Sequence, residues 1–517
     1  MESQNLFTRL FVPEREQKTA ILYERGVLTY AELRKLVESA AGALTAAKVE
    51  PGDRVAMLLP DSPEFIATFV AVIALGGIAV PINPALPQSD QLFILQDCRA
   101  SVLVAEPEMA LALFANSGTP KHVRQVVLTG RQESGAAIAG VETNYLDGAP
   151  ASKFNLPPGN DAQQLHADAF ILYTSGSTGE PKGAVHAQAH VFYTNETYAH
   201  EVLKLRDGDR LFSSSRLPFA YGLGNSFTFP LLNGVTTVLC RDKPSPEVVA
   251  RIFSEHRPTI FFAVPLQFRI LLEHQRKTGS LDASSLRLCV SAGEALPAQL
   301  GKEWQKVFGV EVLDAIGSTE MLHMFISNRE GDLRYGSSGK VLKGFEARLI
   351  DHENAPTPAG EVGNLWIRGA SAASRYWERP DTTRATFVDG WVRTGDLYTQ
   401  DEDGFWWHMG RSDDCFKPTG QWVSPVEVEG VLVRHPQVAA VAVVEGFDEA
   451  GLSCVCAVIV RKDSADLSET EADLRRLCET ALPRFKQPRR YVFVSELPYT
   501  ATGKVQRFKL REQLRAG

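Results

Sequence analysis

The most informative segment of this chain is Phe170-Ile-Leu-Tyr-Thr-Ser-Gly-Ser-Thr-Gly-Glu-Pro-Lys-Gly183, an apolar run followed by a glycine-rich loop. Residues 170–173 are continuously apolar, which is typical of a buried strand. The next ten residues hold three glycines, four hydroxyl side chains and one lysine. Because glycine lets backbone N–H groups approach an anion and lysine adds positive charge, the loop predicts a phosphate site. Gly183 follows Lys182 where a P-loop has Ser or Thr, which disfavours a kinase or P-loop ATPase.

Similar apolar runs recur on both sides of this segment, separated by stretches with helical character. They lie at residues 54–60, 101–106, 125–130, 236–240, 259–265, 286–293 and 311–317. Continuous apolar strands that alternate with helices predict an α/β fold, with parallel sheets flanked by helices on both faces. Residues 330–411 change to alternating strand patterns with many turns, which predicts a β-rich subdomain, and short β and α segments follow.

Two segments make specific predictions about helices. Thr29-Tyr-Ala-Glu32 has the spacing of a capping box and should open an amphipathic helix. Residues 65–82 carry no charge over 18 positions, close to the length of a membrane span. Gly76, Gly77 and Pro81 interrupt this run, so we expect a buried helix that ends at the glycines, followed by a short strand.

Composition excludes several classes of protein. The 517 residues include 54 basic and 62 acidic side chains, and the net charge of −8 argues against a dedicated nucleic-acid binder. Seven cysteines are too few for a disulfide scaffold. Glu2 and the lack of an apolar core after it argue against a signal peptide, so we expect a cytoplasmic protein without a membrane segment.

The C-terminal 35 residues depart from the acidic whole. Residues 483–517 hold nine basic side chains and two acidic ones. They indicate either a solvated surface of mixed charge or a basic face that meets a polyanion such as a nucleotide or coenzyme.

Several motifs, read in order, make the chain similar to the acyl-adenylate-forming (AMP-binding) superfamily, and to its benzoate and aryl-CoA ligase branch. Members activate a carboxylic acid with ATP, release pyrophosphate, and pass the acyl group from AMP to a thiol. The loop at residues 173–183 resembles the phosphate loop of that family. The other matching segments are Ser291–Pro297 (adenine side), Asp314–Glu320 (nucleotide and magnesium), Trp391–Asp396 and Gly410–Asp414 (ribose and hinge) and Pro498–Lys504 (catalytic lysine).

The resemblance implies a role for each matching residue. Lys504 would bond the carboxylate and the α-phosphate oxygens, Thr319 would bond phosphate, and Glu320 would hold Mg²⁺, which prefers one or two carboxylates plus phosphate oxygens. Asp396 and Arg411 would hold the ribose, and Gly420 would lie beside the CoA arm. The remaining nucleotide contacts would be Thr174, Ser175, Gly176, Ser177, Thr178, Gly179, Lys182, Ala292, Gly293, Glu294, Ala295, Asp314, Ala315, Ile316 and Ser318.

The same resemblance points to an aromatic acid as substrate. GSTEMLHMF at residues 317–325 is similar to the benzoate-CoA ligase branch, and it implies an acid pocket. Phe219–Gly224 contains no Asp that could pair with the ammonium of an α-amino acid. We therefore expect benzoate, or an amino- or hydroxybenzoate such as 2-aminobenzoate. The implied pocket residues are Ala220, Tyr221, Gly222, Gly317 and His323.

Three other functions stay open from the sequence. Two are enzymes: a medium-chain acyl-CoA ligase, and a stand-alone adenylating enzyme that loads a carrier protein. The third is a nucleotide-binding protein that has lost catalysis. The sequence is compatible with a homodimer and does not fix the oligomeric state.

The family pattern also predicts the domains. Residues 1–411 would form the large α/β domain with the acid and ATP sites. Residues 412–414 would form a hinge centred on Asp413, and residues 415–517 a small, mobile α+β lid that carries Lys504. Rotation about the hinge would let one site serve both half-reactions. Pro418 restricts the backbone beside this hinge.

His186 and His190 have the i, i+4 spacing of zinc-binding helices. Ala187 stands where a zinc protease has Glu, and no third ligand is evident. We therefore expect an ordinary helix after the phosphate loop.

Overall fold

The computed structural model describes residues 5–115, 118–130, 138, 140–146, 161–175, 180–351, 353–418, 421, 423–448, 451–462, 467–499 and 505–516. The chain divides into two compact units, residues 1–346 with 367–392, and residues 347–366 with 393–517. This division does not coincide with the expected boundary at residues 412–414, because the strands before residue 411 group with the C-terminal residues. The hinge and lid therefore stay a prediction.

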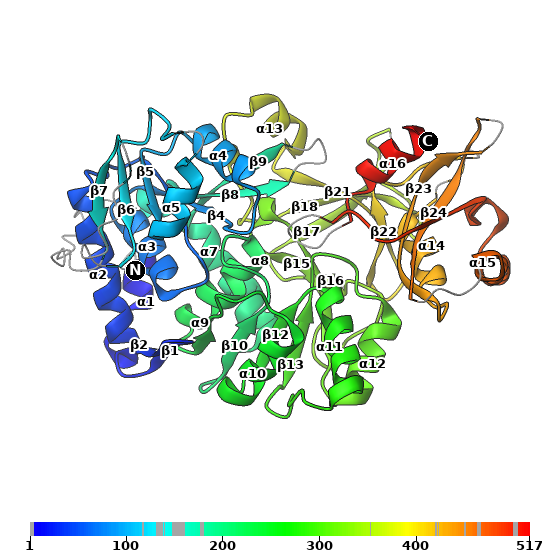
Figure 1. Cartoon of the computed structure of the whole chain (residues 1–517), viewed down its shortest axis with the longest axis horizontal. Coiled ribbons are helices and arrows are strands. Elements are labelled where there is room, and N and C mark those ends of the chain that lie inside the picture. The colour runs from blue at the N-terminus through cyan, green and yellow to red at the C-terminus, as the bar shows by residue number, and fades with distance from the viewer. Residues whose placement is uncertain are drawn as a thin grey trace. The chain divides into compact units, whose positions relative to one another are not determined.

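The first unit contains an eight-stranded sheet (Figure 1). Its strands from β8 to β7 are parallel, while β9 and β19 add to it antiparallel. In order across the sheet they are β19 (Arg375–Tyr376), β9 (Pro181–Ala187), β8 (Asp168–Ser175), β4 (Ile78–Ile82), β3 (Arg54–Leu58), β5 (Val102–Ala105), β6 (Gln125–Leu128) and β7 (Glu142–Tyr145).

Successive residues of β3 show how both faces of this sheet are buried. Val55 and Met57 pack in a core with helices α1 (Leu6–Leu10), α2 (Tyr30–Ala46) and α3 (Pro63–Ala74). Ala56 and Leu58 pack on the opposite face with α4 (Gln88–Asp97) and α5 (Pro107–Phe114). Because neighbouring residues of a strand point to opposite faces, an unbroken apolar strand is what a sheet covered on both sides requires.

A nine-stranded sheet forms the other half of the first unit. Phe212, Phe261 and Trp304 lie in the core between this sheet and three helices, α10 (Pro246–His256), α11 (Pro265–Thr278) and α12 (Ala298–Phe308). In order its strands are β16 (Lys340–Val341), β15 (Met324–Ser327), β14 (Val312–Gly317), β13 (Leu288–Ser291), β12 (Ile260–Ala263), β10 (Arg210–Ser213), β11 (Thr236–Val238), β1 (Thr19–Tyr23) and β2 (Gly26–Thr29). The shorter helices of this unit are α6 (Asp161–His166), α7 (Gln188–Thr194), α8 (Ala220–Leu223), α9 (Phe229–Leu232) and α13 (Pro380–Thr386).

The predicted strands and the predicted α/β class are confirmed, and so are both helix predictions. Thr29 caps α2 in a complete capping box with Glu32. The uncharged run at residues 65–82 contains most of α3 and the short strand β4, and both are buried. Among the described residues, no helix is both long and apolar enough to cross a membrane.

The prediction that a helix follows the glycine-rich loop and contains both His186 and His190 is wrong in its position. Residues 181–187 form β9, antiparallel to β8, and α7 begins only at Gln188. His186 therefore lies on a strand and His190 on a helix. The cause is tertiary: a Cβ on Gly183 would lie 2.6 Å from Ile171 Cγ2. Close pairing with β8 thus outweighs the local i, i+4 pattern.

The second unit contains two sheets. The first sheet has the strand order β17 (Glu346–Ile350), β18 (Gly363–Arg368), β21 (Trp391–Gln400) and β20 (Phe387–Val388). A fifth strand, β22 (Trp406–Arg411), also pairs with β21. The second sheet has the order β23 (Val438–Phe447), β24 (Ser453–Arg461) and β25 (Arg490–Val494). One of its faces packs on α14 (Pro425–Leu432) and α15 (Leu467–Ala481), and the other on α16 (Arg507–Ala516).

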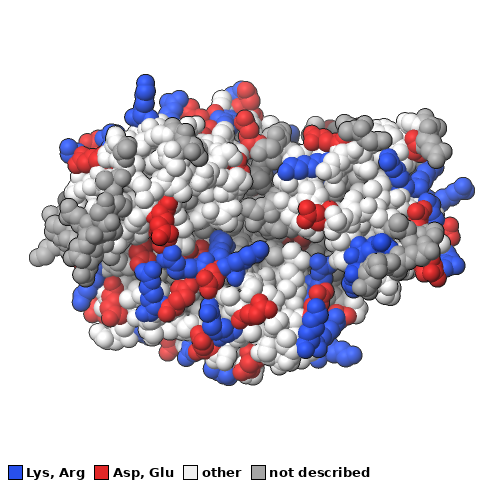
Figure 2. Space-filling view, viewed as in Figure 1, with Lys and Arg blue, Asp and Glu red and all other residues white. Residues whose placement is uncertain are grey.

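Three of the nine basic residues in the C-terminal segment form ion pairs with acidic residues of the second unit. Arg507 bonds both carboxylate oxygens of Glu429 at 2.9 Å, and Arg511 bonds Asp414 at 2.9 Å. Lys486 bonds Glu427 at 2.5 Å. On the face shown in Figure 2, basic and acidic side chains are interspersed. The mixed-charge interpretation therefore holds for at least these three basic residues.

Candidate active site

The strand pair β8 and β9 positions the glycine-rich loop. Thr174 is the register partner of Lys182, and Ser175 is that of Pro181, so the two strands that flank the loop are paired antiparallel up to these residues. Gly176, Ser177, Thr178 and Gly179 lie outside the described residues. Lys182 Nζ lies 5.9 Å from the centroid of the Tyr376 ring, within the range of a cation–π contact.

The turn at Thr319–Met321 is held by donors from outside it. His186 Nε2 lies 2.8 Å from the Thr319 carbonyl oxygen. The Ala373 backbone N–H donates to the Glu320 carbonyl at 2.7 Å, and Ser371 Oγ donates to the Met321 carbonyl at 2.9 Å. Ser318 caps the start of the turn. Three successive carbonyls are thus fixed, which makes the backbone of the turn rigid.

The Glu320 side chain is held as well. The Tyr376 hydroxyl donates to Glu320 Oε1 at 2.6 Å, a short charge-assisted hydrogen bond. The structure thereby brings Lys182 and Glu320 to the same tyrosine from segments almost 140 residues apart. One carboxylate fits Mg²⁺ that takes its other ligands from phosphates and water. Sequence reasoning missed Tyr376, because nothing local in Ser374–Trp377 distinguishes it.

His186 and His190 face each other without forming a larger metal cluster. Their Nδ1 atoms lie 3.0 Å apart, and the His186 ring stacks on Phe170. Burial lowers the pKa of His186 to about 3 and that of His190 to about 4, so both rings are neutral near pH 7. The described residues contain no cluster of three or more potential metal ligands. The pair thus supports the Thr319 turn.

The predicted adenine-side and nucleotide segments lie on neighbouring strands. Ser291 at the end of β13 is the register partner of Asp314 in β14, so Ala292, Gly293, Glu294 and Ala295 emerge beside the segment that starts at Asp314. Ala315 and Ile316 continue β14 and pair with β15. Asp314 is buried, and burial raises the pKa of its carboxyl well above the usual value. The carboxyl ends of parallel strands are where open α/β sheets bind ligands.

Two of the residues predicted for the acid pocket, Tyr221 and Gly317, lie against His323. Ala220, Tyr221 and Gly222 lie on α8, and the Tyr221 and His323 ring centroids are 5.9 Å apart. His323 also meets the Phe229 ring edge-on at 4.5 Å, and a Cβ on Gly317 would lie 2.5 Å from the His323 carbonyl oxygen. The structure thus places Tyr221, Phe229 and Gly317 around His323, and Ala220 and Gly222 lie on the same short helix as Tyr221.

Asn225 is a further residue at this place that sequence reasoning missed. Its Oδ1 lies 3.2 Å from His323 Nε2, and its side chain is fully buried. Asn225 follows the predicted pocket segment by only a few residues, in the π-helical turn Gly224–Thr228. No local signal in the sequence distinguishes it, because its partner His323 lies 98 residues further along the chain.

The predicted ribose residues pair with each other in the second unit. Asp396 and Arg411 are register partners of β21 and β22, and Arg411 Nη1 lies 3.2 Å from Asp396 Oδ1. His408 Nε2 lies 3.6 Å from the same oxygen. Asp413 is exposed in the turn after β22. Lys504 and Gly420 lie outside the described residues.

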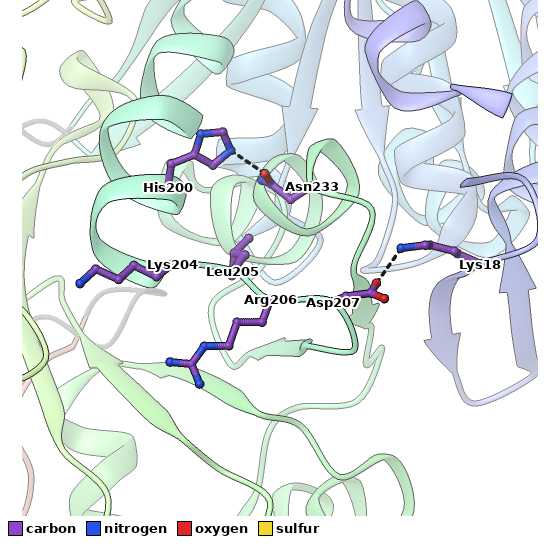
Figure 3. Close-up of a pocket in the computed structure, with 7 residues that line it drawn as sticks. All are labelled: Lys18, His200, Lys204, Leu205, Arg206, Asp207 and Asn233. Atoms are coloured by element: carbon purple, nitrogen blue, oxygen red, sulfur yellow. Dashed lines mark hydrogen bonds and ion pairs between the residues drawn. The ribbon is translucent and has the colours of Figure 1, made fainter. Parts of the chain in front are cut away.

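A separate cavity of about 400 Å³ opens in the first unit (Figure 3). Two pairs of its side chains bond each other: Lys18 bonds Asp207 at 2.6 Å, and His200 bonds Asn233 at 2.6 Å. None of the residues that line it belongs to the motifs above. They are Lys18, His200, Lys204, Leu205, Arg206, Asp207 and Asn233.

Comparison with known proteins agrees with this arrangement. Residues 10–377 match the family model of AMP-binding enzymes, and residues 427–504 match that of the AMP-binding enzyme C-terminal domain. The chain is 41% identical to a benzoate–CoA ligase of Thauera aromatica, over 98% of this chain and 95% of the relative. It is 35% identical to a 3-hydroxybenzoate–CoA/4-hydroxybenzoate–CoA ligase of the same organism, over 97% and 94%.

A solved structure is similar over the same length. The anthranilate CoA ligase AuaEII, in complex with anthranoyl-AMP, superposes with a TM-score of 0.89 at 35% identity, covering 99% of this chain and 98% of that one. The two family models match residues on both sides of the predicted hinge, and the relatives match nearly the whole chain. The chain therefore belongs to the family of AMP-binding enzymes, in its branch of benzoate and aryl-CoA ligases.

Proposed function

We propose that this protein is an ATP-dependent aryl-CoA ligase, an AMP-forming acid–thiol ligase that acts on a benzoate-type acid. The main support for the proposal is the position of His323. Its ring packs against Tyr221 and Phe229, and it follows the turn that contains Glu320 by only a few residues. An aromatic acid at that cluster would present its carboxylate to a nucleotide at the turn. The relatives named above are ligases for benzoate, hydroxybenzoates and anthranilate.

In the first half-reaction, a carboxylate oxygen attacks the α-phosphorus of ATP, and the bond to the pyrophosphate oxygen breaks. Both reactants are anionic, so positive charge at the α-phosphate should dominate the rate. We assign that charge to Lys504, and the charge at the outer phosphates to Lys182 and the backbone of residues 174–179. Glu320 would hold Mg²⁺, which when bound neutralises phosphate charge. Tyr376 keeps the Glu320 carboxylate in place.

In the second half-reaction, the sulfur of CoA attacks the acyl carbonyl and its thiol proton passes to solvent. AMP departs with the bonding electrons of the bond between the acyl carbon and the phosphate oxygen. We propose that rotation about Asp413 withdraws Lys504 between the two steps and brings Gly420 beside the pantetheine arm. Asp396 and Arg411 would hold the ribose; their mutual ion pair at 3.2 Å keeps both side chains oriented.

Half-reactions measured separately test these assignments. Lys504→Ala should abolish pyrophosphate release yet keep much of the thioester step from supplied aryl-AMP, whereas equal loss in both halves would contradict the role of Lys504. Lys509→Ala is a matched control on the same unit, and it should leave both halves near wild type. Asp413→Pro should impair the CoA step more than pyrophosphate exchange; normal activity in both halves would contradict the rotation.

One panel of assays identifies both the acid that the protein activates and the thiol that accepts the acyl group. Wild-type protein is assayed for pyrophosphate release with benzoate, aminobenzoates, hydroxybenzoates and medium-chain fatty acids, and for thioester formation with free CoA. Aromatic acids and free CoA should both support turnover. Preference for fatty acids would favour a medium-chain ligase, turnover only with a carrier protein would favour a loading enzyme, and no pyrophosphate at all would favour an inactive binding protein.

Two properties complete the proposal. The seven cysteines are all buried free thiols, which suits a reducing cytoplasm. We also propose a homodimer, to be tested by light scattering at concentrations used in the assay; a monomeric mass would contradict it.

A further inference from the structure

A buried carboxylate connects segments that follow the two sheets of the first unit. Asp61 lies between β3 of the eight-stranded sheet and α3, and it is 5% exposed. Its Oδ1 accepts a hydrogen bond of 3.1 Å from the backbone N–H of Leu217, in the loop that follows β10 of the nine-stranded sheet. One buried side chain thus ties together the carboxyl ends of one strand from each sheet.

Arg216 is the second partner of this carboxylate. Its Nη1 lies 3.7 Å from Asp61 Oδ2, and the same guanidinium donates to the carbonyls of Cys240 at 2.5 Å and Asp242 at 2.6 Å. Burial raises the pKa of Asp61 to about 6, and the charge of Arg216 opposes the rise, so the ionised form predominates at pH 7.5. A buried carboxylate is costly unless a cation and a hydrogen-bond donor face it, and Asp61 has both.

The loop after β10 leads directly into α8, the helix that carries three of the predicted pocket residues. The Phe219 N–H donates to the Arg216 carbonyl at 3.1 Å, which closes a turn just before the helix. A Cβ on Gly222 would lie 2.0 Å from the Arg216 carbonyl oxygen, so α8 packs directly on this turn. The Tyr221 hydroxyl anchors the helix a second time, since it donates to the Val290 carbonyl at 3.0 Å. A shift of the turn would therefore move α8 or strain that second contact.

We propose that Asp61 is a positioning residue for the aromatic acid: together with Arg216 it fixes the turn on which α8 rests, and so the place of Tyr221 in the pocket. Asp61 acts through this turn, because its own oxygens face Leu217 and Arg216. The inference rests on the proposed function, which makes α8 a wall of the acid pocket. The predicted nucleotide segments follow β13 and β14, which pair with each other. Loss of Asp61 should therefore weaken binding of the acid more than binding of ATP.

Steady-state kinetics of pyrophosphate release at pH 7.5 separate the acid from ATP. In Asp61→Ala, KM for benzoate should rise about tenfold, because a hydrogen bond to a charged group is lost, whereas KM for ATP should stay within about twofold. Asp61→Asn keeps an acceptor for the Leu217 N–H, so KM for benzoate should return to within about threefold of wild type. An equal rise in both KM values, an unchanged KM for benzoate, or no recovery in the Asn variant would overturn the proposal.

Asp209→Ala is the matched control. Asp209 is 4% exposed, pairs with Arg287 at 2.6 Å and accepts a hydrogen bond of 2.8 Å from the Arg206 backbone N–H, but it precedes β10 instead of following it. Its loss should destabilise the first unit without changing the ratio of the two KM values. The same selective rise in KM for benzoate in this variant would mean that any loss of stability produces it, and would contradict the role of Asp61.

Hydrogen exchange of peptides that cover residues 214–224 tests the positioning without turnover. Exchange there should be about tenfold faster in Asp61→Ala than in wild type, and unchanged in Asp209→Ala. If the Ala variant fails to fold, Arg216→Gln releases the turn at a side chain that is 24% exposed, and it should speed exchange in the same peptides. Unchanged exchange in whichever of these two variants folds would overturn the proposal. Failure of the proposed function is distinguishable, because wild type would then release no pyrophosphate with any aromatic acid, while exchange would still report whether Asp61 holds the turn.

Discussion

Mild acid should destabilise the first unit through three histidines that are buried in the neutral state. Burial lowers the pKa of His186 and His323 to about 3 and that of His190 to about 4, against a usual value of 6.5. A group with a depressed folded pKa favours folding fully above its unfolded pKa, and this contribution is lost as the pH falls toward the folded pKa. At pH 5 the contribution of each ring to the free energy of unfolding has fallen by about 2 kcal/mol. This value follows because pH 5 is 1.5 units below the usual pKa of 6.5, and each unit corresponds to about 1.36 kcal/mol.

Two carboxyls in the same unit act in the opposite direction, because burial also raises the pKa of Asp314 well above its usual value. Burial raises the pKa of Asp61 from 3.8 to about 6, with Arg216 opposing the rise. The contribution of Asp61 to the free energy of unfolding is fully present below pH 3.8 and is lost as the pH rises through 6. At pH 5 this carboxyl therefore stabilises the fold by about 1.4 kcal/mol relative to pH 7.5. The net loss of stability between pH 7.5 and pH 5 is therefore smaller than the sum of the three histidine contributions, because both carboxyls offset part of it.

Urea titrations between pH 5 and 7.5, followed by hydrogen exchange of the first unit, measure this loss. Replacing His323 by Phe should reduce the loss by about 2 kcal/mol, because one titrating ring is removed. Asp61→Asn should increase it by about 1.4 kcal/mol. His200→Gln is the control, since this half-exposed ring bonds Asn233 and stays in contact with water. If the His323 variant lost as much stability in acid as wild type, the inference that the buried ring is neutral would be refuted.

Three substitutions test the site by its packing. Tyr376→Phe removes the 2.6 Å bond to Glu320 and should raise the Mg²⁺ concentration for half-maximal pyrophosphate exchange about tenfold; an unchanged Mg²⁺ dependence would contradict the positioning role. Gly224→Ala places a Cβ 2.5 Å from His323 Cδ2 and should alter the order of aromatic acids, and the same order would exclude that contact from the substrate site. Gly317→Ala places a Cβ 2.5 Å from the backbone of His323 and should lower the melting temperature by several degrees, as measured by circular dichroism; an unaltered melting temperature would mean that the turn can shift freely.

The strands and the glycine-rich loop could be predicted because their signals are local. Each apolar run of four to eight residues is long enough to form a strand, and β8 with its loop follows directly from Phe170–Gly183. The capping box at Thr29 and the glycines at Gly76 and Gly77 mark helix ends by their own backbone chemistry. The order of the motifs was sufficient to predict the family, and it also predicted most residues of the candidate site.

The remaining parts depend on contacts between distant segments. His186 and His190 have helical spacing, yet pairing of β9 with β8 places His186 on a strand against Phe170. Tyr376 and Asn225 have no local signal, because their partners Glu320 and His323 are distant in sequence.

By itself, the sequence determined the alternation of strands and helices, and it predicted a phosphate loop and the residues that would bind a nucleotide. Those properties are encoded in residue type and short-range spacing, which the chain carries whether or not it is folded. Only the tertiary structure decided which side chains hold Glu320 and which carboxylate holds the turn before α8. Hydrogen bonds across the sheet and the loss of water on burial act between segments that meet only after folding.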